Sequence, residues 1–227
     1  MLELNDRFLV KICGLSTPAT MEAALDAGAD MVGLVFHRKS PRSVSHATAT
    51  ALAQQALGRA QSVALVVDCD LDVAAALAAT VKPDWFQLHG SESPAVVGQM
   101  RKITGARQMK VLGVGSKDDL APFADHAAVA DRMMLDAKAP KDAAYPGGHG
   151  VSFDWAILAT LGGERPFMLA GGLTPDNVAG AIHAVQALGV RLCGVDVSSG
   201  VESAPGVKDI GKIKAFVQAA RAAATGA

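Results

Sequence analysis

Phe8-Leu9-Val10-Lys11-Ile12-Cys13 is the first of eight apolar runs in the chain, and Gly14-Leu15-Ser16-Thr17-Pro18 follows it directly. The run has the length of a β-strand, and the turn residues after it predict a tight turn into a helix. Side chains two residues apart on a strand project to the same face, so Lys11 and Cys13 are expected to lie together. The thiol then lies at the carboxyl end of a strand, where parallel α/β proteins place their chemistry.

The same pattern repeats along the chain. Seven further apolar runs span Met31–Phe36, Ser62–Val67, Trp85–His89, Met109–Val114, Arg132–Asp136, Phe167–Gly171 and Leu192–Val197. Each is short and continuously apolar, as strands covered on both faces are. An Ala/Leu-rich stretch predicted to be helical follows each run, beginning with Thr20–Asp30, whose Gly28 favours a helix end, and finishing with Val207–Ala223.

Eight strand-helix units of roughly 25 to 30 residues each predict a closed (βα)8 or TIM barrel, with eight parallel strands and outer helices. We expect residues 1–227 to form this single domain, with an Ala/Gly tail that frays after about Arg221. A doubly wound open sheet is the second interpretation. It is disfavoured because no Gly-x-Gly-x-x-Gly follows the first strand and the units are evenly spaced.

Composition limits the classes of partner. The chain has 227 residues, 21 Lys+Arg against 22 Asp+Glu, and a formal net charge of -1, without a basic run interleaved with aromatics. Nucleic acid and anionic membranes are therefore poor candidate partners. The sequence has neither a membrane-spanning apolar stretch nor a signal-peptide pattern, and its three widely separated cysteines predict reduced thiols. We expect a cytoplasmic protein, either a monomer or a homodimer.

Two glycine-bearing turns follow the last two predicted strands. They read Ala170-Gly171-Gly172-Leu173 and Val197-Ser198-Ser199-Gly200. In barrels of this kind the loops after strands seven and eight frequently bind phosphate, because backbone N–H groups and a helix N-terminus face the anion. A purely steric need for glycine is the alternative. The position of both turns favours a phosphate site.

Several polar residues lie at the same predicted rim. Asp136 ends an apolar strand, where partial desolvation favours the protonated form that a general acid requires, although an ion pair with Arg132 or Lys138 is also open. Arg42 follows Pro41 in a loop and has the fork that binds carboxylates, unless it is simply an exposed arginine. Gln87 and His89 share a strand face, and His89 is either a base or a hydrogen-bonded support. Cys13 is either chemical or a small buried apolar residue.

The Pro/Gly-bearing segment Ala137–Gly150 is too long for an ordinary loop and is expected to cover the site. Asp68 and Asp196 also fall at predicted strand ends. No His-x-x-x-His or paired-ligand spacing indicates a metal site.

Six of these motifs, in order, closely resemble the phosphoribosylanthranilate isomerase family of tryptophan biosynthesis. They are Lys11-Ile12-Cys13-Gly14, Ser40-Pro41-Arg42, Gln87-Leu88-His89-Gly90, Leu135-Asp136, Gly171 to Asn177 and Asp196 to Glu202. The resemblance covers residues 11 to 202. It departs from the family at His149, where relatives typically carry a small hydroxyl residue.

The resemblance implies an eight-fold barrel without metal or organic cofactor that catalyses an Amadori rearrangement of a phosphosugar-anthranilate. By residue, it implies that Cys13 is the general base, Asp136 the general acid and Arg42 the anchor of the substrate carboxylate. The expected site has Cys13 and Asp136 as catalytic residues; the residues expected to bind the substrate are Lys11, Arg42, Gln87, His89, Gly171, Gly172, Asp196, Ser198, Ser199 and Gly200.

Two other functions compete with this hypothesis. One is a different phosphosugar enzyme on the same barrel, such as a ribulose-phosphate epimerase with metal ligands or an indole-glycerol-phosphate synthase that relies on lysine and glutamate. The other is a non-catalytic barrel that binds a phosphorylated ligand. Such a binder needs neither Cys13 nor Asp136, so the presence of both favours an enzyme.

Overall fold

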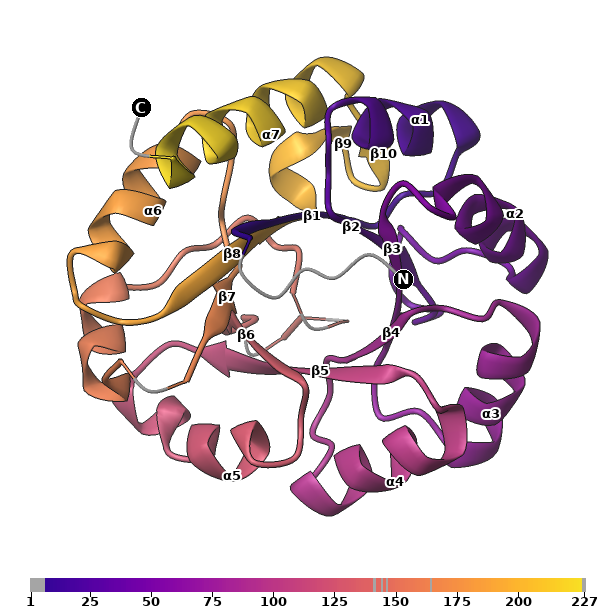
Figure 1. The fold of residues 1–227 in the computed structure, drawn as a ribbon, viewed down its shortest axis with the longest axis horizontal. Helices are drawn as coiled ribbons and strands as arrows, with labels where there is room; N and C mark the ends of the chain where they lie inside the picture. The colour runs from indigo at the N-terminus through magenta and orange to yellow at the C-terminus, as the bar shows by residue number, and fades with distance from the viewer. Residues whose placement is uncertain (1–6, 141, 144, 146, 164, 226–227) are drawn as a thin grey trace.

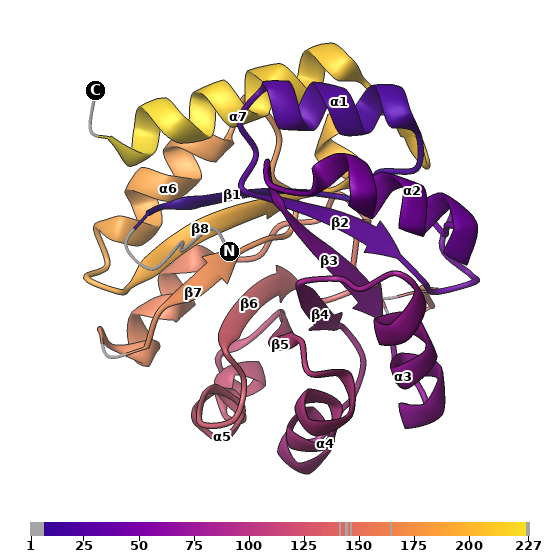
Figure 2. The same ribbon diagram turned by 45° about the vertical axis from the view of Figure 1, so that its right-hand side comes forward.

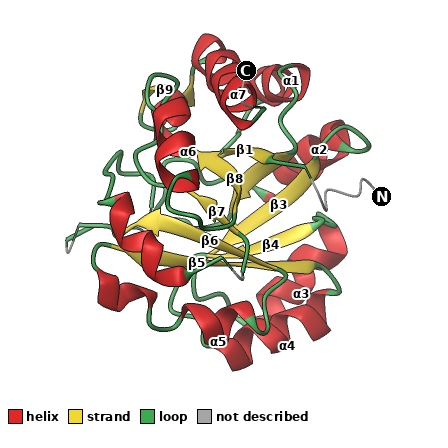
Figure 3. Ribbon diagram, turned by 60° about the vertical axis from the view of Figure 1, so that its left-hand side comes forward, coloured by secondary structure: helices red, strands yellow, loops and turns green. Residues whose placement is uncertain are grey.

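Eight parallel strands form a closed barrel in chain order in this computed structural model, which describes residues 7–140, 142–143, 145, 147–163 and 165–225. Helices surround the strands on all sides (Figure 1), and the same layering appears in Figure 3. The predicted (βα)8 barrel is therefore confirmed. The barrel strands are β1 Leu9–Cys13, β2 Met31–Val35, β3 Gln61–Val66, β4 Trp85–Leu88, β5 Arg107–Val114, β6 Arg132–Ala137, β7 Phe167–Leu169 and β8 Leu192–Val197.

The outer layer consists of seven α-helices and three 3-10 helices within the described residues. The α-helices are α1 Pro18–Asp26, α2 His46–Ala56, α3 Leu71–Thr80, α4 Pro94–Thr104, α5 Phe123–Ala127, α6 Val178–Gln186 and α7 Ile210–Ala224. The 3-10 helices are η1 Lys117–Leu120, η2 Trp155–Leu161 and η3 Ser199–Val201. Of the helices in the described ranges, not one combines the length and the apolar character needed to cross a membrane.

Strand periodicity decides which side chains enter the barrel. Leu9 belongs to an apolar cluster inside the barrel, and Cys13 belongs to a second inner cluster at the carboxyl end. Val10 and Ile12 point the other way and pack in the outer core under the helices. The alternation confirms that β1 directs its thiol toward the centre of the rim.

Closure of the barrel pairs the first strand with the last. In the β1–β8 ladder Lys11 lies opposite Asp196, which brings together residues 185 positions apart. Helix α7 packs beside α1 on the outside (Figure 2). Arg221 of α7 binds Asp30, whose carboxylate also accepts the N–H of Val10 at 2.8 Å, so the chain end is fastened to the start of β1.

Three local predictions are corrected. The segment after β6 forms the seven-residue 3-10 helix η2, between the N-cap Asp154 and Gly162, rather than an α-helix. Val207 and Lys208 form β10, which pairs with β9 (Glu202–Ala204), so the last helix begins at Ile210. That helix continues to Ala224, beyond the point where fraying is expected, since alanine strongly favours helix and Ala220 and Ala223 are buried.

Candidate active site

The carboxyl ends of the strands surround a pocket with two adjoining halves, whose empty space together with the solvent at their mouths is about 380 and 440 Å³. Asp136, Gly147, Gly148, Asp196 and Ser198 line both halves. The larger half, called the acid-base half below, is completed by Cys13, Val35, His37, Ser40, Arg42, Leu65, Val67, Gln87, His89 and Tyr145. The smaller half, called the anion half, is completed by Ala137, His149, Gly150, Val151, Ala170, Gly171, Gly172, Leu173, Val197 and Ser199.

Lys11 and Cys13 are neighbours, as the strand spacing predicts. The Lys11 side chain is fully buried, its ammonium donates to Asp196 Oδ1 at 2.8 Å, and it lies within hydrogen-bond reach of the Cys13 sulfur. Burial lowers the pKa of Lys11, but the charges of Asp196 and Cys13 outweigh this effect and raise it overall. Lys11 is therefore a permanent cation beneath the thiol rather than part of the pocket lining.

Cys13 lines the acid-base half at the end of β1. Burial raises the pKa of its thiol, and Asp196 adds to the rise, whereas Lys11 and Lys208 oppose it. The pKa remains above its usual value, so the free protein holds this residue mainly as a thiol at neutral pH.

Asp136 faces the same half from β6. Its Oδ2 lies 3.3 Å from His89 Nε2, and the Gln87 amide nitrogen lies 3.4 Å from His89 Nδ1. The alternative ion pairs of Asp136 are not formed: Lys138 binds Asp119, and Arg132 donates to the sulfur of Cys193. Within the described residues Asp136 pairs with His89 alone, which leaves its carboxyl group without a contact to Arg132 or Lys138.

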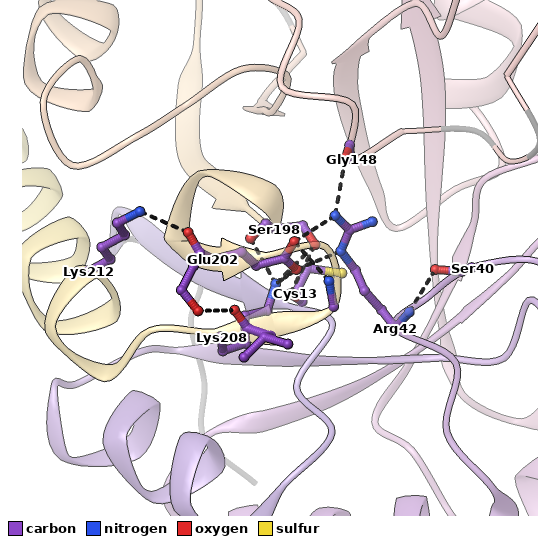
Figure 4. A network of polar contacts seen from close by, with 11 residues as sticks. Cys13, Ser40, Arg42, Gly148, Ser198, Glu202, Lys208 and Lys212 are labelled. Atoms are coloured by element: carbon purple, nitrogen blue, oxygen red, sulfur yellow. Dashed lines mark hydrogen bonds and ion pairs between the residues drawn. The ribbon is translucent and has the colours of Figure 1, made fainter.

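Arg42 is buried, contrary to the picture of an exposed loop arginine. Its Nε and Nη2 donate to the two carboxylate oxygens of Glu202 at 2.7 and 2.9 Å, and Nη2 also donates to the Gly148 carbonyl at 3.2 Å (Figure 4). The guanidinium fork thus holds a carboxylate of the protein.

The anion half is formed where three loops meet. Gly171 and Gly172 have φ values of +89° and +64°, and a Cβ at Gly172 would lie 2.8 Å from the Val151 carbonyl carbon. Glycine is therefore required for the loop after β7 to meet the loop after β6. On the other side η3 begins at Ser199, as the sequence predicts for the turn after the last strand.

Two predicted rim residues do not line either half. Gly200 lies behind Ser199, where any side chain would collide with the Leu173 carbonyl. Asp68 adopts a positive φ of 44° and its Oδ1 accepts the Ser91 N–H at 2.7 Å. Asp68 therefore stabilises the loops after β3 and β4.

The long loop covers the site as expected, with Pro146 outside the described residues. His149 stacks on Tyr145, with ring centroids 4.8 Å apart, and its Nε2 lies 2.8 Å from the Tyr145 carbonyl oxygen. The sequence does not predict a place in the site for Tyr145, Glu202 or Lys208. An aromatic in a Gly/Pro loop is a usable signal for Tyr145, whereas the other two depend on contacts across the fold.

Comparison with known proteins gives a consistent result. The chain matches the protein family described as N-(5'phosphoribosyl)anthranilate (PRA) isomerase over residues 10–219. It is 57% identical over 213 residues to N-(5'-phosphoribosyl)anthranilate isomerase of Rhodopseudomonas palustris (strain BisA53), covering 94% of this chain and 95% of that protein.

Solved structures agree. Phosphoribosyl anthranilate isomerase from Thermotoga maritima is 32% identical, with a TM-score of 0.80 over 94% of this chain and 98% of the other. A phosphoribosyl anthranilate isomerase in complex with reduced 1-(o-carboxyphenylamino)-1-deoxyribulose 5-phosphate is 30% identical, with a TM-score of 0.77 over 94% and 98%.

Proposed function

Because the chain belongs to the N-(5'-phosphoribosyl)anthranilate isomerase family, we propose that Cys13 and Asp136 are the base and the acid of that isomerisation. The chain is the isomerase that converts N-(5'-phosphoribosyl)anthranilate to 1-(2-carboxyphenylamino)-1-deoxyribulose 5-phosphate in tryptophan biosynthesis. The competing phosphosugar enzymes and the non-catalytic barrel are set aside by this relationship. The residue roles below are the proposal.

The rearrangement needs one proton delivered and one proton removed. Asp136 donates a proton to the ring oxygen, the C1–O bond breaks, and the anthranilate nitrogen lone pair forms a C1=N iminium. Cys13, as thiolate, then takes the proton from C2, and the electron pair moves to give an enolamine. Tautomerisation of the enolamine places a proton on C1 and leaves the ketone at C2, so the product is an isomer of the substrate.

The observation that carries this proposal is the position of the two groups. Cys13 on β1 and Asp136 on β6 line the same pocket from different sides of the barrel. A carboxylate anchor, Arg42, lies in the acid-base half, and glycine and serine turns form the adjoining anion half. This arrangement suits a substrate with an aromatic carboxylate at one end and a phosphate at the other.

The raised pKa of the Cys13 thiol is consistent with this order of steps. Ring opening creates a positively charged iminium next to C2, which acidifies the C2 proton and stabilises a thiolate nearby. Lys11 supplies a fixed positive charge from below. We propose that Cys13 becomes an effective base only after Asp136 has acted.

The direct test is turnover of freshly prepared phosphoribosylanthranilate, followed by the loss of anthranilate-type fluorescence. Turnover by the parent that vanishes in the Cys13 and Asp136 variants supports the assignment. Full turnover by either variant removes that residue from the mechanism. We further propose that the reaction takes place in the cytoplasm and that the 227 residues act as a single domain.

Arg42→Ala is expected to raise KM by about tenfold to 100-fold with a smaller change in kcat, because a charge-assisted contact is worth about 1.5 to 3 kcal/mol. Arg42→Lys should not restore KM, since lysine has no planar fork for Glu202. Steady-state kinetics measures both. Arg38→Ala, at an exposed position of the same loop, should behave like the parent. An unchanged KM in Arg42→Ala would mean that the carboxylate is held elsewhere.

A crystal grown in sulfate or phosphate is expected to hold the anion between Gly172 and Ser199, bound mainly by backbone N–H groups. Inorganic phosphate should then compete with the substrate. Gly172→Ala should weaken this inhibition, because its Cβ would press on Val151 and part the loops, whereas Ser199→Ala keeps the backbone and should change it little. An anion bound elsewhere on the rim, with this site empty at saturation, would contradict the assignment.

A further inference from the structure

A buried lysine lies beneath the Ser198 turn, outside both halves of the pocket. Lys208 of β10 has a fully buried side chain, and its ammonium donates to Glu202 Oε1 at 2.7 Å, to the Ser198 carbonyl at 2.8 Å and to Ser198 Oγ at 3.3 Å (Figure 4). Three partners satisfy its three donors. Nothing in the acid-base steps described above uses this cation.

Glu202 joins this lysine to the carboxylate anchor. One carboxylate accepts from both Arg42 and Lys208, and all three side chains are at most 5% exposed. Burial alone would raise the pKa of Glu202, but the two cations lower it overall, so the group stays ionised. Two cations and one anion leave the trio with one net positive charge in the interior. A buried ion cluster of this kind is weak evidence that it stabilises the fold. A role in the pocket above the cluster is the alternative.

The trio is connected to the base through Ser198. Ser198 Oγ donates to the Cys13 carbonyl at 3.2 Å, while Lys208 holds the carbonyl and hydroxyl of Ser198 from the other side. The turn that borders both halves of the pocket is thereby fixed against the end of β1. Removing Lys208 releases one side of that turn.

Two buried lysines lower the pKa of the Cys13 thiol. Lys11 acts by its charge and by a hydrogen bond, and its ion-pair partner Asp196 on β8 opposes part of this effect. Lys208 acts by its charge from the trio, which carries one net positive charge. The other titratable groups that share the cavity with Cys13 are His37, Arg42, His89, Asp136 and Tyr145.

We propose that Lys208 is a positioning residue of the isomerisation, which fixes the Ser198 turn against Cys13 and adds, beside Lys11, a second buried positive charge that favours the thiolate. The proposal rests on the role of Cys13 as the base. Burial lowers the pKa of Lys208 overall, and the Glu202 carboxylate, which also binds Arg42, opposes part of this fall.

The test is the pH dependence of Cys13 alkylation by iodoacetamide, measured in a Cys69→Ser/Cys193→Ser background. Lys208→Met removes the charge and the hydrogen bonds, and Lys208→Gln removes the charge but keeps a hydrogen-bond donor. In both variants the pH midpoint of alkylation should rise by about half a unit or more. Lys212→Met is the matched control: Lys212 donates to the Glu202 carbonyl at 2.8 Å but is exposed, so its removal should leave the midpoint unchanged.

Kinetics separates positioning from charge. The KM of Lys208→Met should rise several-fold, because the Ser198 turn is released, whereas Lys208→Gln retains a donor to Ser198 and should keep KM near that of the parent. If the pH midpoint of Cys13 alkylation in Lys208→Gln equals that of the parent, the proposal is overturned. If Lys208→Met does not fold, Lys208→Gln alone provides the test. Alkylation does not depend on turnover. A fully active Cys13→Ser would therefore refute the base assignment without affecting the charge measurement.

Discussion

Cys13→Ser is expected to reduce kcat by about 10²-fold or more while KM changes by no more than several-fold. A serine hydroxyl fills nearly the same volume at the end of β1, so the pocket and its anchors should persist. The hydroxyl is a far weaker base than a thiolate, even above the Lys11 ammonium. The loss should therefore fall on the step that removes the C2 proton.

Matched controls exist within the chain. Cys69→Ser and Cys193→Ser replace the other two free thiols, which lie outside both halves of the pocket, and should leave kcat and KM unchanged. A primary kinetic isotope effect with deuterium at C2 should appear or grow in Cys13→Ser. If Cys13→Ser remains within a few-fold of the parent, Cys13 takes no part in the chemistry.

The pH profile follows from the direction of the Cys13 pKa. Because burial raises this pKa, the thiolate fraction of the free enzyme is small at neutral pH and grows as pH increases. kcat/KM measured across a pH series should therefore rise with pH as the Cys13 thiolate forms. Any second limb belongs to coupled groups of the site rather than to one residue.

The barrel was predictable because its strands carry a redundant signal. Runs such as Leu9–Cys13 and Met31–Val35 are buried at every position, so they are apolar in sequence apart from the ion-paired Lys11. The β9–β10 hairpin carries no such signal. Glu202 and Lys208 owe their burial to each other rather than to apolar character, so a helix was predicted where β10 lies.

Candidate residues were predictable where position alone determines their surroundings. Cys13 and Asp136 lie at strand ends, and barrel geometry sends all such ends to one rim. Ion pairing was not predictable, because Arg42 and Glu202 are 160 residues apart and Lys11 meets Asp196 only through closure of β1 on β8. The sequence therefore predicts Lys11 and Arg42 as binding residues but not the carboxylates of Asp196 and Glu202 that pair with them.

Asp136→Asn is the second substitution expected to have a large effect, with turnover reduced by about 10²-fold or more. The amide keeps the shape of the side chain and a partner for His89, but it has no acidic proton for the ring oxygen. Ring opening should then limit the rate. Two further variants serve as controls. His89→Gln should reduce turnover less, because His89 supports the carboxyl group. Lys138→Met should leave turnover unchanged, because Lys138 binds Asp119.

The decisive comparison uses a substrate whose ring is already open. An acyclic imine analogue bypasses the protonation of the ring oxygen and leaves only the removal of the C2 proton. On this analogue Asp136→Asn should recover much of the parental rate, whereas Cys13→Ser should stay impaired, because the two residues act on different bonds. If both variants are damaged equally on the opened analogue, Asp136 does not serve as the ring-opening acid. Its contact with His89 would then be its main contribution, and the proton for the ring oxygen would have to come from another group in the acid-base half.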